Sequence, residues 1–175
     1  MMTSLDATRH ASFLSVTDAR THVLVLGSLP GVKSLAAQQY YAHPQNGFWR
    51  LAGGAIGVDL TALDYPDRLA ALLAAGIGVW DVIATARREG SLDTAIREVE
   101  SNDLRTLVAT LPSLRLVAFN GQKAAAIGGP LLGAATPRLT LPSSSPAYTL
   151  AFAAKAAAWR VLGDYLDSYR GPGVS

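Results

Sequence analysis

Four short hydrophobic runs divide the chain, and each is bounded by glycine, proline or polar residues. We predict strands over residues 22–26, 77–82, 114–119 and 138–141. Short apolar runs of this kind are typical of parallel strands that are buried on both faces. The pattern therefore favours a central, mainly parallel sheet.

Segments with helical patterns lie between and after these runs. The predicted helices cover residues 66–75, 103–110 and 121–127, and a long helix lies within residues 147–169. Asn102 is the predicted N-cap of the second helix, and an apolar stripe from Leu150 to Leu166 marks the last one. Strands that alternate with helices predict the α/β class, with three α/β/α layers and a four-stranded central sheet. Ligands in such folds bind at the carboxyl ends of the strands.

The first predicted strand is followed by a glycine-rich turn and then by an aromatic segment. Gly27 to Gly31 form the turn Gly-Ser-Leu-Pro-Gly, whose backbone N–H groups can approach a ligand, or which serves only as a connection. The segment from Gln39 to Arg50 concentrates aromatic and polar side chains, which suits a pocket for a flat ligand. In the alternative interpretation Phe48 and Trp49 anchor the hydrophobic core, and we expect this of Trp49. We expect Asn46 to be functional, because a buried amide needs several hydrogen-bond partners.

Single polar side chains follow the second and third strands. Asp81 could bind a substrate, position a water or hold a neighbouring loop. Asn120 offers a donor and an acceptor in one plane, which matches the edge of a nucleobase but also suits a helix cap. Arg87, Arg88 and Arg97 could contact phosphates or form a solvated face.

Three consecutive serines between prolines follow the fourth strand, in Leu141-Pro-Ser-Ser-Ser-Pro-Ala147. Hydroxyls and backbone amides of this kind commonly bind phosphate oxygens. The loop is predicted to enter the long helix directly, so that the helix N-terminus adds a dipole favourable to anions. A plain Ser/Pro linker is the alternative interpretation.

The size, the cysteine and histidine counts and the net charge of the chain exclude several classes of function. The 175 residues are the size of one domain, predicted over residues 1–170 with a flexible tail at 171–175. The absence of cysteine excludes disulfides and thiolate chemistry, and three scattered histidines argue against a metal site. A net charge of +2 permits a polyanionic partner without requiring one. No stretch resembles a membrane span or a secretory signal, so we expect a cytoplasmic protein that binds no membrane.

Five segments together resemble the uracil DNA glycosylase superfamily, and above all its hypoxanthine DNA glycosylase branch. They are Gly27–Leu35, Gln39–Trp49, Gly78–Ile83, Phe119–Gly121 and Leu141–Ala147. The most specific part is Tyr-Tyr-Ala-His-Pro-x-Asn-x-Phe-Trp. Mismatch-specific uracil glycosylases have a similar segment, but they carry a water-positioning Asn in the first turn, where this chain has Leu29. The hypoxanthine branch also lacks that Asn.

The resemblance implies a monofunctional glycosylase of base excision repair, which binds double-stranded DNA as a monomer, flips a deaminated base and needs no cofactor or metal. It implies that Asn46 orients the attacking water and that Asp81 assists. Tyr41 or Phe48 would stack on the base. The implied base-binding residues are Ser28, Leu29, Gly31, Tyr41, Phe48 and Asn120, and the implied DNA-binding residues are His43, Ser143, Ser144, Ser145, Pro146, Ala147 and Tyr148.

Other functions fit the same residues. One is a glycosylase specific for uracil or for mismatched uracil, since substrate choice rests on pocket shape and a few hydrogen bonds. Another is a non-catalytic DNA- or nucleotide-binding module, because fold does not fix function. Such a module would lose little affinity if Asn46 and Asp81 both became alanine. A weaker alternative is a flavodoxin-like binder of a small molecule, which bound flavin would colour yellow.

Overall fold

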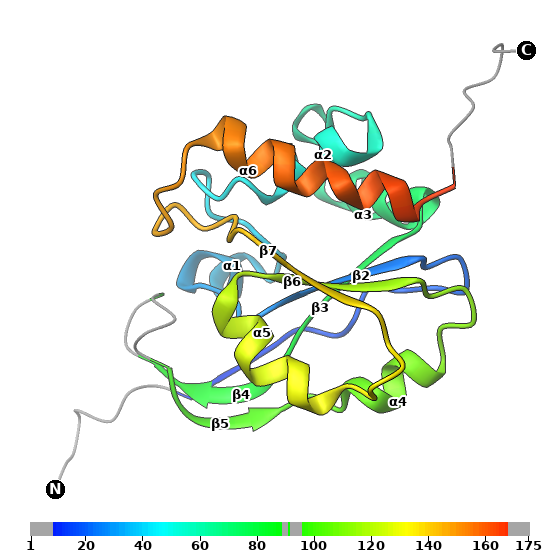
Figure 1. Cartoon of the computed structure of the whole chain (residues 1–175). Coiled ribbons are helices and arrows are strands. Elements are labelled where there is room, and N and C mark those ends of the chain that lie inside the picture. The colour runs from blue at the N-terminus through cyan, green and yellow to red at the C-terminus, as the bar shows by residue number, and fades with distance from the viewer. Residues whose placement is uncertain (1–8, 89–90, 92–95, 168–175) are drawn as a thin grey trace, which may run out of the picture.

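A central sheet of four parallel strands organises the protein (Figure 1). The computed structural model describes residues 9–88, 91 and 96–167. The strands are β2 (Val23–Gly27), β3 (Ile77–Asp81), β6 (Leu116–Asn120) and β7 (Arg138–Leu141), paired in the order β3-β2-β6-β7. All three pairs are parallel, so the four carboxyl ends meet at one edge of the sheet. The predicted parallel sheet is confirmed, and the predicted strands match these within two residues at each end.

Alternate side chains of the strands build two hydrophobic layers. Val23 and Val25 of β2 pack on one face of the sheet, and Leu24 and Leu26 pack on the other. All four are fully buried, and β6 shows the same alternation. Successive side chains of a strand point to opposite faces. A strand that is covered on both faces therefore needs the continuous apolar run seen in the sequence.

Helices cover both faces of the sheet and complete the three predicted layers (Figure 1). One face carries α2 (Phe48–Ile56), η1 (Leu60–Ala62), α3 (Tyr65–Ala75), α6 (Phe152–Trp159) and η4 (Arg160–Tyr165). The other carries α4 (Leu104–Ala109) and α5 (Gln122–Gly128), with η3 (Gly129–Leu131) after α5. The short helix α1 (Val32–Ala37) follows the carboxyl end of β2. Among the described residues, no helix has the length and hydrophobicity needed to cross a membrane.

A second, smaller sheet was not predicted. It contains β1 (Arg9–Ala11), β4 (Ile83–Arg87) and β5 (Arg97–Ser101), which are antiparallel in the order β1-β4-β5. Only Val82 separates the end of β3 from the start of β4, so the chain passes directly from one sheet to the other. All five residues of β5 are exposed. This strand lacks the apolar pattern on which the prediction depended.

The C-terminal helix differs from the prediction. It begins at Phe152 rather than near Ala147, and it continues as a 3₁₀ helix to Tyr165. The predicted apolar stripe is wrong within α6, where Lys155 and Trp159 are the buried residues and Leu150, before the helix, is exposed. It is confirmed in η4, where Leu162 is buried and Val161 packs against the core. In an alanine-rich segment the helical periodicity is weak, since alanine fits either face. Residues 168–169 of the predicted helix and the predicted tail at 171–175 lie outside the described residues.

The predicted cap of α4 is also one residue off. The Asp103 carboxylate, not Asn102, accepts a hydrogen bond from the Thr106 N–H at 3.1 Å. The Asn102 side chain instead donates to the Asp81 carbonyl at 2.7 Å and to the Ser12 hydroxyl at 3.1 Å. Asn102 therefore fixes the end of β3, where the carboxyl edge of the sheet begins.

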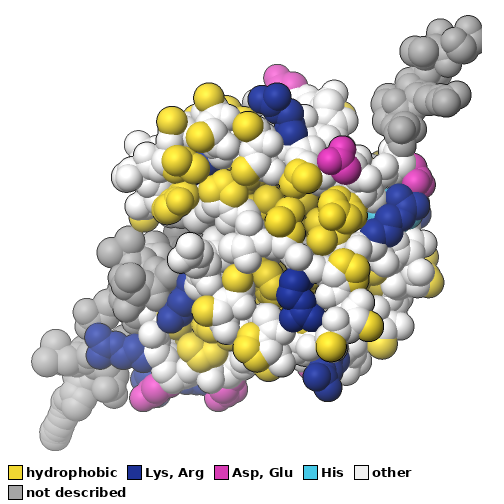
Figure 2. Space-filling model, viewed as in Figure 1, with side chains coloured by type: hydrophobic (Ala, Val, Ile, Leu, Met, Phe, Trp, Pro, Cys, Tyr) yellow, Lys and Arg dark blue, Asp and Glu magenta, His cyan; other side chains and the backbone are white. Residues whose placement is uncertain are grey.

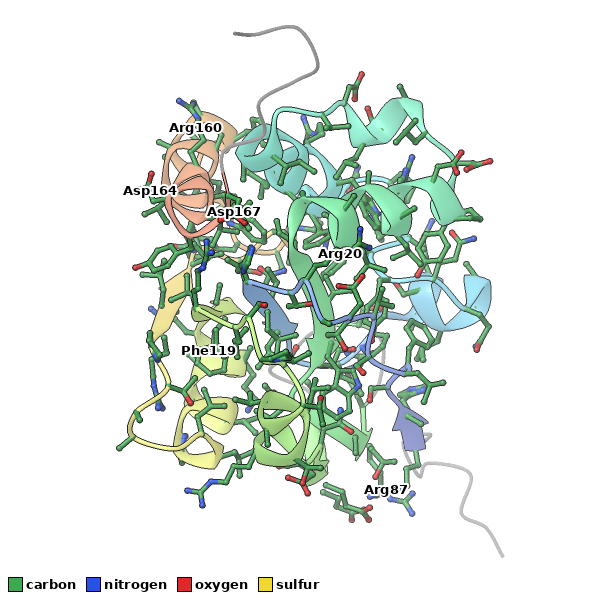
Figure 3. All side chains as sticks on the ribbon, turned by 90° about the vertical axis from the view of Figure 1, so that its right-hand side faces the viewer. Arg20, Arg87, Phe119, Arg160, Asp164 and Asp167 are labelled. Carbon is green, nitrogen blue, oxygen red and sulfur yellow. The ribbon has the colours of Figure 1, made fainter. Side chains whose placement is uncertain are left out.

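Asp167, the last residue that the structure describes, is tied to the opposite, amino edge of the sheet (Figure 3). Its carboxylate accepts from Arg115 at 2.9 Å and contacts the His22 ring at 3.1 Å. The hydrogen bond from Arg115, followed by that from His22, lowers the pKa of Asp167. This stabilisation is present above the ordinary aspartate pKa and is lost as the pH falls through the lowered value.

We therefore expect Asp167→Asn to lower the melting temperature slightly at pH 7, and the difference from wild type to shrink at pH 3. Thermal unfolding at the two pH values measures this. Asp164→Asn is the matched control, because Asp164 is an exposed carboxylate a few residues away. An equal loss at both pH values would show that charge is not the cause.

Candidate active site

A pocket of about 540 Å³ opens at the carboxyl ends of the central strands. Its walls come from the turn after β2, the loop before α2, the ends of β3 and β6, and residues 142–148, called here the serine loop. These segments gather on the left of Figure 1, around α1. Every site residue predicted from the sequence lines this pocket except Phe48.

Asp81 lies against the backbone of the first turn. It ends β3 directly beside Gly27 of β2, and the residue is only 3% exposed although it borders the pocket. A Cβ atom on Gly27 would lie 2.6 Å from Asp81 Oδ1 and 3.0 Å from the Tyr41 hydroxyl. Only glycine allows the carboxylate and the phenol to approach the turn this closely.

Asn46 is held rigidly at the pocket wall. Its Oδ1 accepts a hydrogen bond from the Phe48 N–H at 2.9 Å, which satisfies one donor at the start of α2. This bond fixes the plane of the Asn46 amide. The second lone pair of Oδ1 and the two side-chain N–H groups then point in fixed directions. The nearby His43 ring accepts from the Gln45 N–H through Nδ1 at 3.0 Å, so a neutral His43 carries its proton on Nε2.

Tyr41 forms the aromatic wall of the pocket, and Phe48 supports it from behind. The two rings are stacked, with centroids 3.9 Å apart and planes 15° apart. Phe48 is fully buried and lies outside the pocket lining, which fits the alternative of a core anchor and leaves Tyr41 as the one of the two predicted stacking residues that borders the pocket. The stacking surface open to the pocket is that of Tyr41.

The backbone of Tyr41 has a left-handed conformation, with φ of 53°. This conformation is uncommon for a bulky residue and costs free energy. Trp49 Nε1 donates to the Tyr41 carbonyl at 3.1 Å, and the Ala42 N–H donates to the Ser34 hydroxyl at 3.0 Å. The buried indole of Trp49 is thus the expected core anchor, and it also holds Tyr41 in place.

Asn120 connects the end of β6 to the serine loop. Its Oδ1 accepts from the Ser144 N–H at 2.9 Å, and its Nδ2 donates to the Ser144 hydroxyl at 2.9 Å and to the Tyr41 hydroxyl at 3.2 Å. The Asn120 amide is therefore largely committed to the protein. Its Nδ2 could donate to a base only by giving up the Ser144 or the Tyr41 hydroxyl, whereas its Oδ1 keeps a second lone pair.

The serine loop is shaped by its own hydroxyls. The Ser143 hydroxyl accepts from the Ser145 N–H at 3.1 Å, and the Ser145 hydroxyl accepts from the Ala147 N–H at 3.2 Å. Each hydroxyl keeps its own O–H for donation to an anion. The expected help from a helix dipole is wrong, because α6 begins only at Phe152.

Two buried side chains anchor the first turn, Gly27–Gly31, to the body of the protein. The Arg88 guanidinium is buried and donates to the Pro30 carbonyl. Leu29 belongs to the hydrophobic layer on that face and also borders the pocket. Of the three arginines considered for phosphate contact, Arg87 pairs with Glu98 in the small sheet and Arg97 lies opposite Arg87. None of the three lines the pocket.

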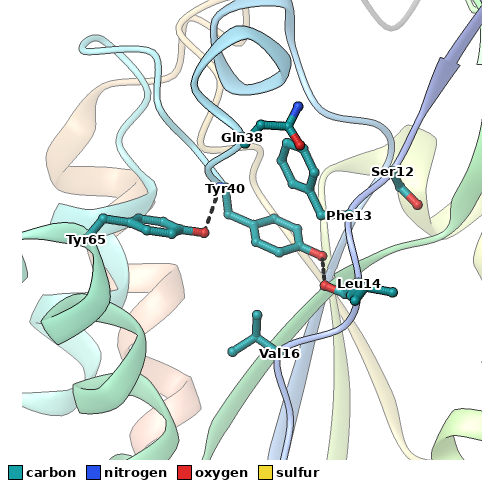
Figure 4. A pocket seen from close by; sticks show the side chains of 7 residues that line it. All are labelled: Ser12, Phe13, Leu14, Val16, Gln38, Tyr40 and Tyr65. Atoms are coloured by element: carbon teal, nitrogen blue, oxygen red, sulfur yellow. Dashed lines mark hydrogen bonds between the residues drawn. The ribbon is translucent and has the colours of Figure 1, made fainter.

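A second pocket, of about 410 Å³, lies beside Tyr40 (Figure 4). Phe13, Leu14 and Tyr65 also line it. The Tyr40 hydroxyl donates to the Leu14 carbonyl at 2.8 Å, and the Tyr40 N–H donates to the Tyr65 hydroxyl at 3.0 Å. Burial raises the pKa of the Tyr40 phenol, so it stays protonated. These bonds fix the segment that presents Tyr41.

Sequence reasoning did not single out Lys33 or Ser91. Lys33 is exposed on α1 and borders the pocket, and the Ser91 hydroxyl accepts from the Val32 N–H at 2.8 Å. A lone lysine and a lone serine carry no sequence pattern that would have identified them. Within residues 9–88, 91 and 96–167, no cluster of three His, Asp or Glu side chains is arranged to hold a metal ion.

The fold and this pocket define a class of protein. A family model of the uracil DNA glycosylase superfamily matches residues 14–163. The chain therefore belongs to the uracil DNA glycosylase superfamily. A solution NMR structure of a candidate uracil DNA glycosylase from Methanosarcina acetivorans superimposes with a TM-score of 0.81 at 40% identity, over 89% of this chain and 97% of that one.

Two relatives place the chain within the superfamily. A hypoxanthine DNA glycosylase of Methanosarcina acetivorans is 45% identical over 135 residues, which are 77% of this chain and 85% of the relative. A hypoxanthine DNA glycosylase of Methanosarcina barkeri is 49% identical over 111 residues, which are 63% of this chain and 70% of the relative. The resemblance predicted from the five segments is confirmed.

Proposed function

We propose that this protein is a monofunctional hypoxanthine DNA glycosylase, which hydrolyses the bond between the base and the deoxyribose in double-stranded DNA. The observation that carries this proposal is that Asn46, Asp81 and Tyr41 line a single pocket at the carboxyl edge of the sheet. The 45% identity to a hypoxanthine DNA glycosylase supports the choice of base. The reaction would begin base excision repair by leaving an abasic site.

The pocket suits a base that has left the duplex. A flipped base would stack on the open face of Tyr41, whose other face is fixed against Phe48. Stacking of this kind is worth about 1–3 kcal/mol per base in single-strand binders. Backbone amides between Ser28 and Gly31 would contact the base edge, and Asn120 would reach it once the Tyr41 hydroxyl gives way.

Bond cleavage needs one placed water and stabilisation of two developing charges. As the glycosidic bond breaks, its electron pair leaves with the base, and positive charge grows on the sugar. Asn46, fixed by Phe48, would orient the water that attacks the sugar carbon. The Asp81 side chain would favour the positive sugar and receive the proton of the water. The departing base takes up a proton from solvent, the sugar keeps the new hydroxyl, and Asp81 returns the water's proton to solvent.

The DNA backbone would be held by the serine loop. The Ser143 and Ser145 hydroxyls retain donors, and Ser144 fixes the loop to Asn120. Beyond them, Pro146, Ala147 and Tyr148 are exposed, and they would occupy the space left by the flipped base. We propose that the enzyme acts as a monomer, because all of these contacts come from one chain.

Single-turnover base release from four labelled duplexes tests the proposal. The duplexes carry hypoxanthine or uracil, each opposite thymine or guanine, and alkali reveals abasic sites. We expect hypoxanthine to be released faster than uracil, with strands that break only after alkali. Release of uracil alone would show that the protein is a uracil glycosylase of the same superfamily, not a hypoxanthine glycosylase. Strand breakage without alkali would contradict the monofunctional reaction and direct attention to the amine of Lys33.

A further inference from the structure

Lys155 is a buried cation on the inward face of α6. Its residue is 6% exposed, and it shares that face with Trp159. Burial lowers the pKa of its ammonium group, because the charged form loses contact with water. A lysine at such a position costs stability relative to an apolar side chain of similar shape. The hydrogen bonds of the ammonium group indicate why a lysine is present here.

Both inward side chains of α6 hold the backbone of the serine loop. Lys155 Nζ donates to the Ser145 carbonyl at 3.0 Å, and Trp159 Nε1 donates to the Pro142 carbonyl at 2.9 Å. The Ser145 carbonyl also accepts the Tyr148 N–H at 3.1 Å, and the Lys155 ammonium lies 5.4 Å from the centre of the Tyr148 ring. The lysine thus binds the turn that carries Pro146 and Ala147.

The other side of this turn faces outward. Tyr148, Leu150 and Phe152 are large hydrophobic residues with 42–48% exposure. In Figure 2, hydrophobic side chains gather over the end of α6 and the loop that leads to it. A surface of this kind can bind tightly only if its backbone is already ordered, because ordering a loop on binding costs affinity.

We propose that Lys155 is a positioning residue for DNA binding, which acts through the Ser145 carbonyl to preorganise the serine loop. This inference rests on the proposed function, since it takes DNA as the ligand of the loop. The ammonium lies beneath the backbone of the loop rather than at its surface. Its effect is therefore on the shape of the loop and not on the charge presented to a phosphate.

The test is Lys155→Met, which keeps the length of the side chain and removes its charge and donors. Binding to a duplex with a non-hydrolysable abasic analogue is measured by fluorescence anisotropy between 50 and 200 mM salt. We expect the Kd to rise about tenfold. The slope of log Kd against log salt should stay unchanged, because the contacts that the serine loop makes with DNA involve uncharged groups. The single-turnover rate at saturating enzyme should fall by a smaller factor than the affinity.

Arg160→Met is the matched control. Arg160 is an exposed cation at the start of η4, and it points away from the body of the protein (Figure 3). The same loss of charge there should leave the Kd within twofold of wild type. If Lys155→Met does not fold, as judged by circular dichroism, Lys155→Leu, which also lacks the charge and the donors, carries the same comparison.

Three results would overturn the inference. One is an unchanged Kd in Lys155→Met. Another is a salt slope that falls by about 0.9, which would mean that the ammonium itself neutralises a phosphate. The third is a loss of rate at saturation as large as the loss of affinity. Failure of the proposed function would look different, since wild-type protein would then bind the duplex and release no hypoxanthine.

Discussion

Asn46→Ala is expected to reduce single-turnover release of hypoxanthine by at least about a hundredfold to a thousandfold, the usual loss when one oriented polar group is removed from an active site. The Asn46 carboxamide accepts the Phe48 N–H at 2.9 Å, so in the proposed mechanism it would orient a water without further ordering. Alanine cannot orient a water. Loss of the contact at the start of α2 should cost about 1 kcal/mol, which leaves the protein folded.

The control for this variant is Gln45→Ala. Gln45 is the exposed neighbour of Asn46, it does not line the pocket, and only its backbone binds the His43 ring. It should release base at the wild-type rate. Affinity for a duplex with an abasic analogue should stay within a few fold in both variants. Wild-type release by Asn46→Ala would remove Asn46 from the mechanism.

Gly27→Ala is expected to lower base release by about a hundredfold and to destabilise the fold by about 1–3 kcal/mol. A Cβ at this position would lie 2.6 Å from Asp81 Oδ1, and the Asp81 side chain is buried and has little room to move. The carboxylate and the Tyr41 ring must then shift from the pocket wall. Melting temperature and single-turnover rate measure the two effects.

Gly54→Ala provides the matched comparison. Gly54 is an exposed residue within α2, and a Cβ there would meet nothing within 4 Å. Alanine should keep full activity and raise stability by about 0.5–1 kcal/mol, because glycine is unfavourable inside a helix. If Gly27→Ala behaved like Gly54→Ala, the close approach of Asp81 to the first turn would have no role in the reaction.

The fold could be predicted where burial on both faces imposes a continuous apolar pattern. This holds for the four central strands, whose ends were placed within two residues. The small sheet could not be predicted, because Arg97–Ser101 is exposed throughout and three of its five residues are charged. The buried face of α6 could not be predicted for two reasons. Alanine fits either face of a helix, and Lys155 lies on the buried face although lysine is almost always exposed.

Part of the candidate site could be predicted because Asp81, Asn120 and the serine loop follow strands, and parallel strands bring their carboxyl ends together. The individual contacts could not be predicted. Either Tyr41 or Phe48 was expected to stack on the base, and only the structure shows that Phe48 is completely buried behind Tyr41. The partners of Asn120 depend on the path of the serine loop, and that path is set by Ser144 and Lys155 through contacts between distant segments.

The most direct test of the central claim is chromatographic detection of free base after one turnover on the duplex with hypoxanthine opposite thymine. Our account predicts close to one free hypoxanthine per duplex for the wild-type protein, and none above background for Asn46→Ala. Tight binding of the duplex by wild-type protein without any free hypoxanthine would contradict it. The protein would then be a DNA-binding module on a glycosylase fold.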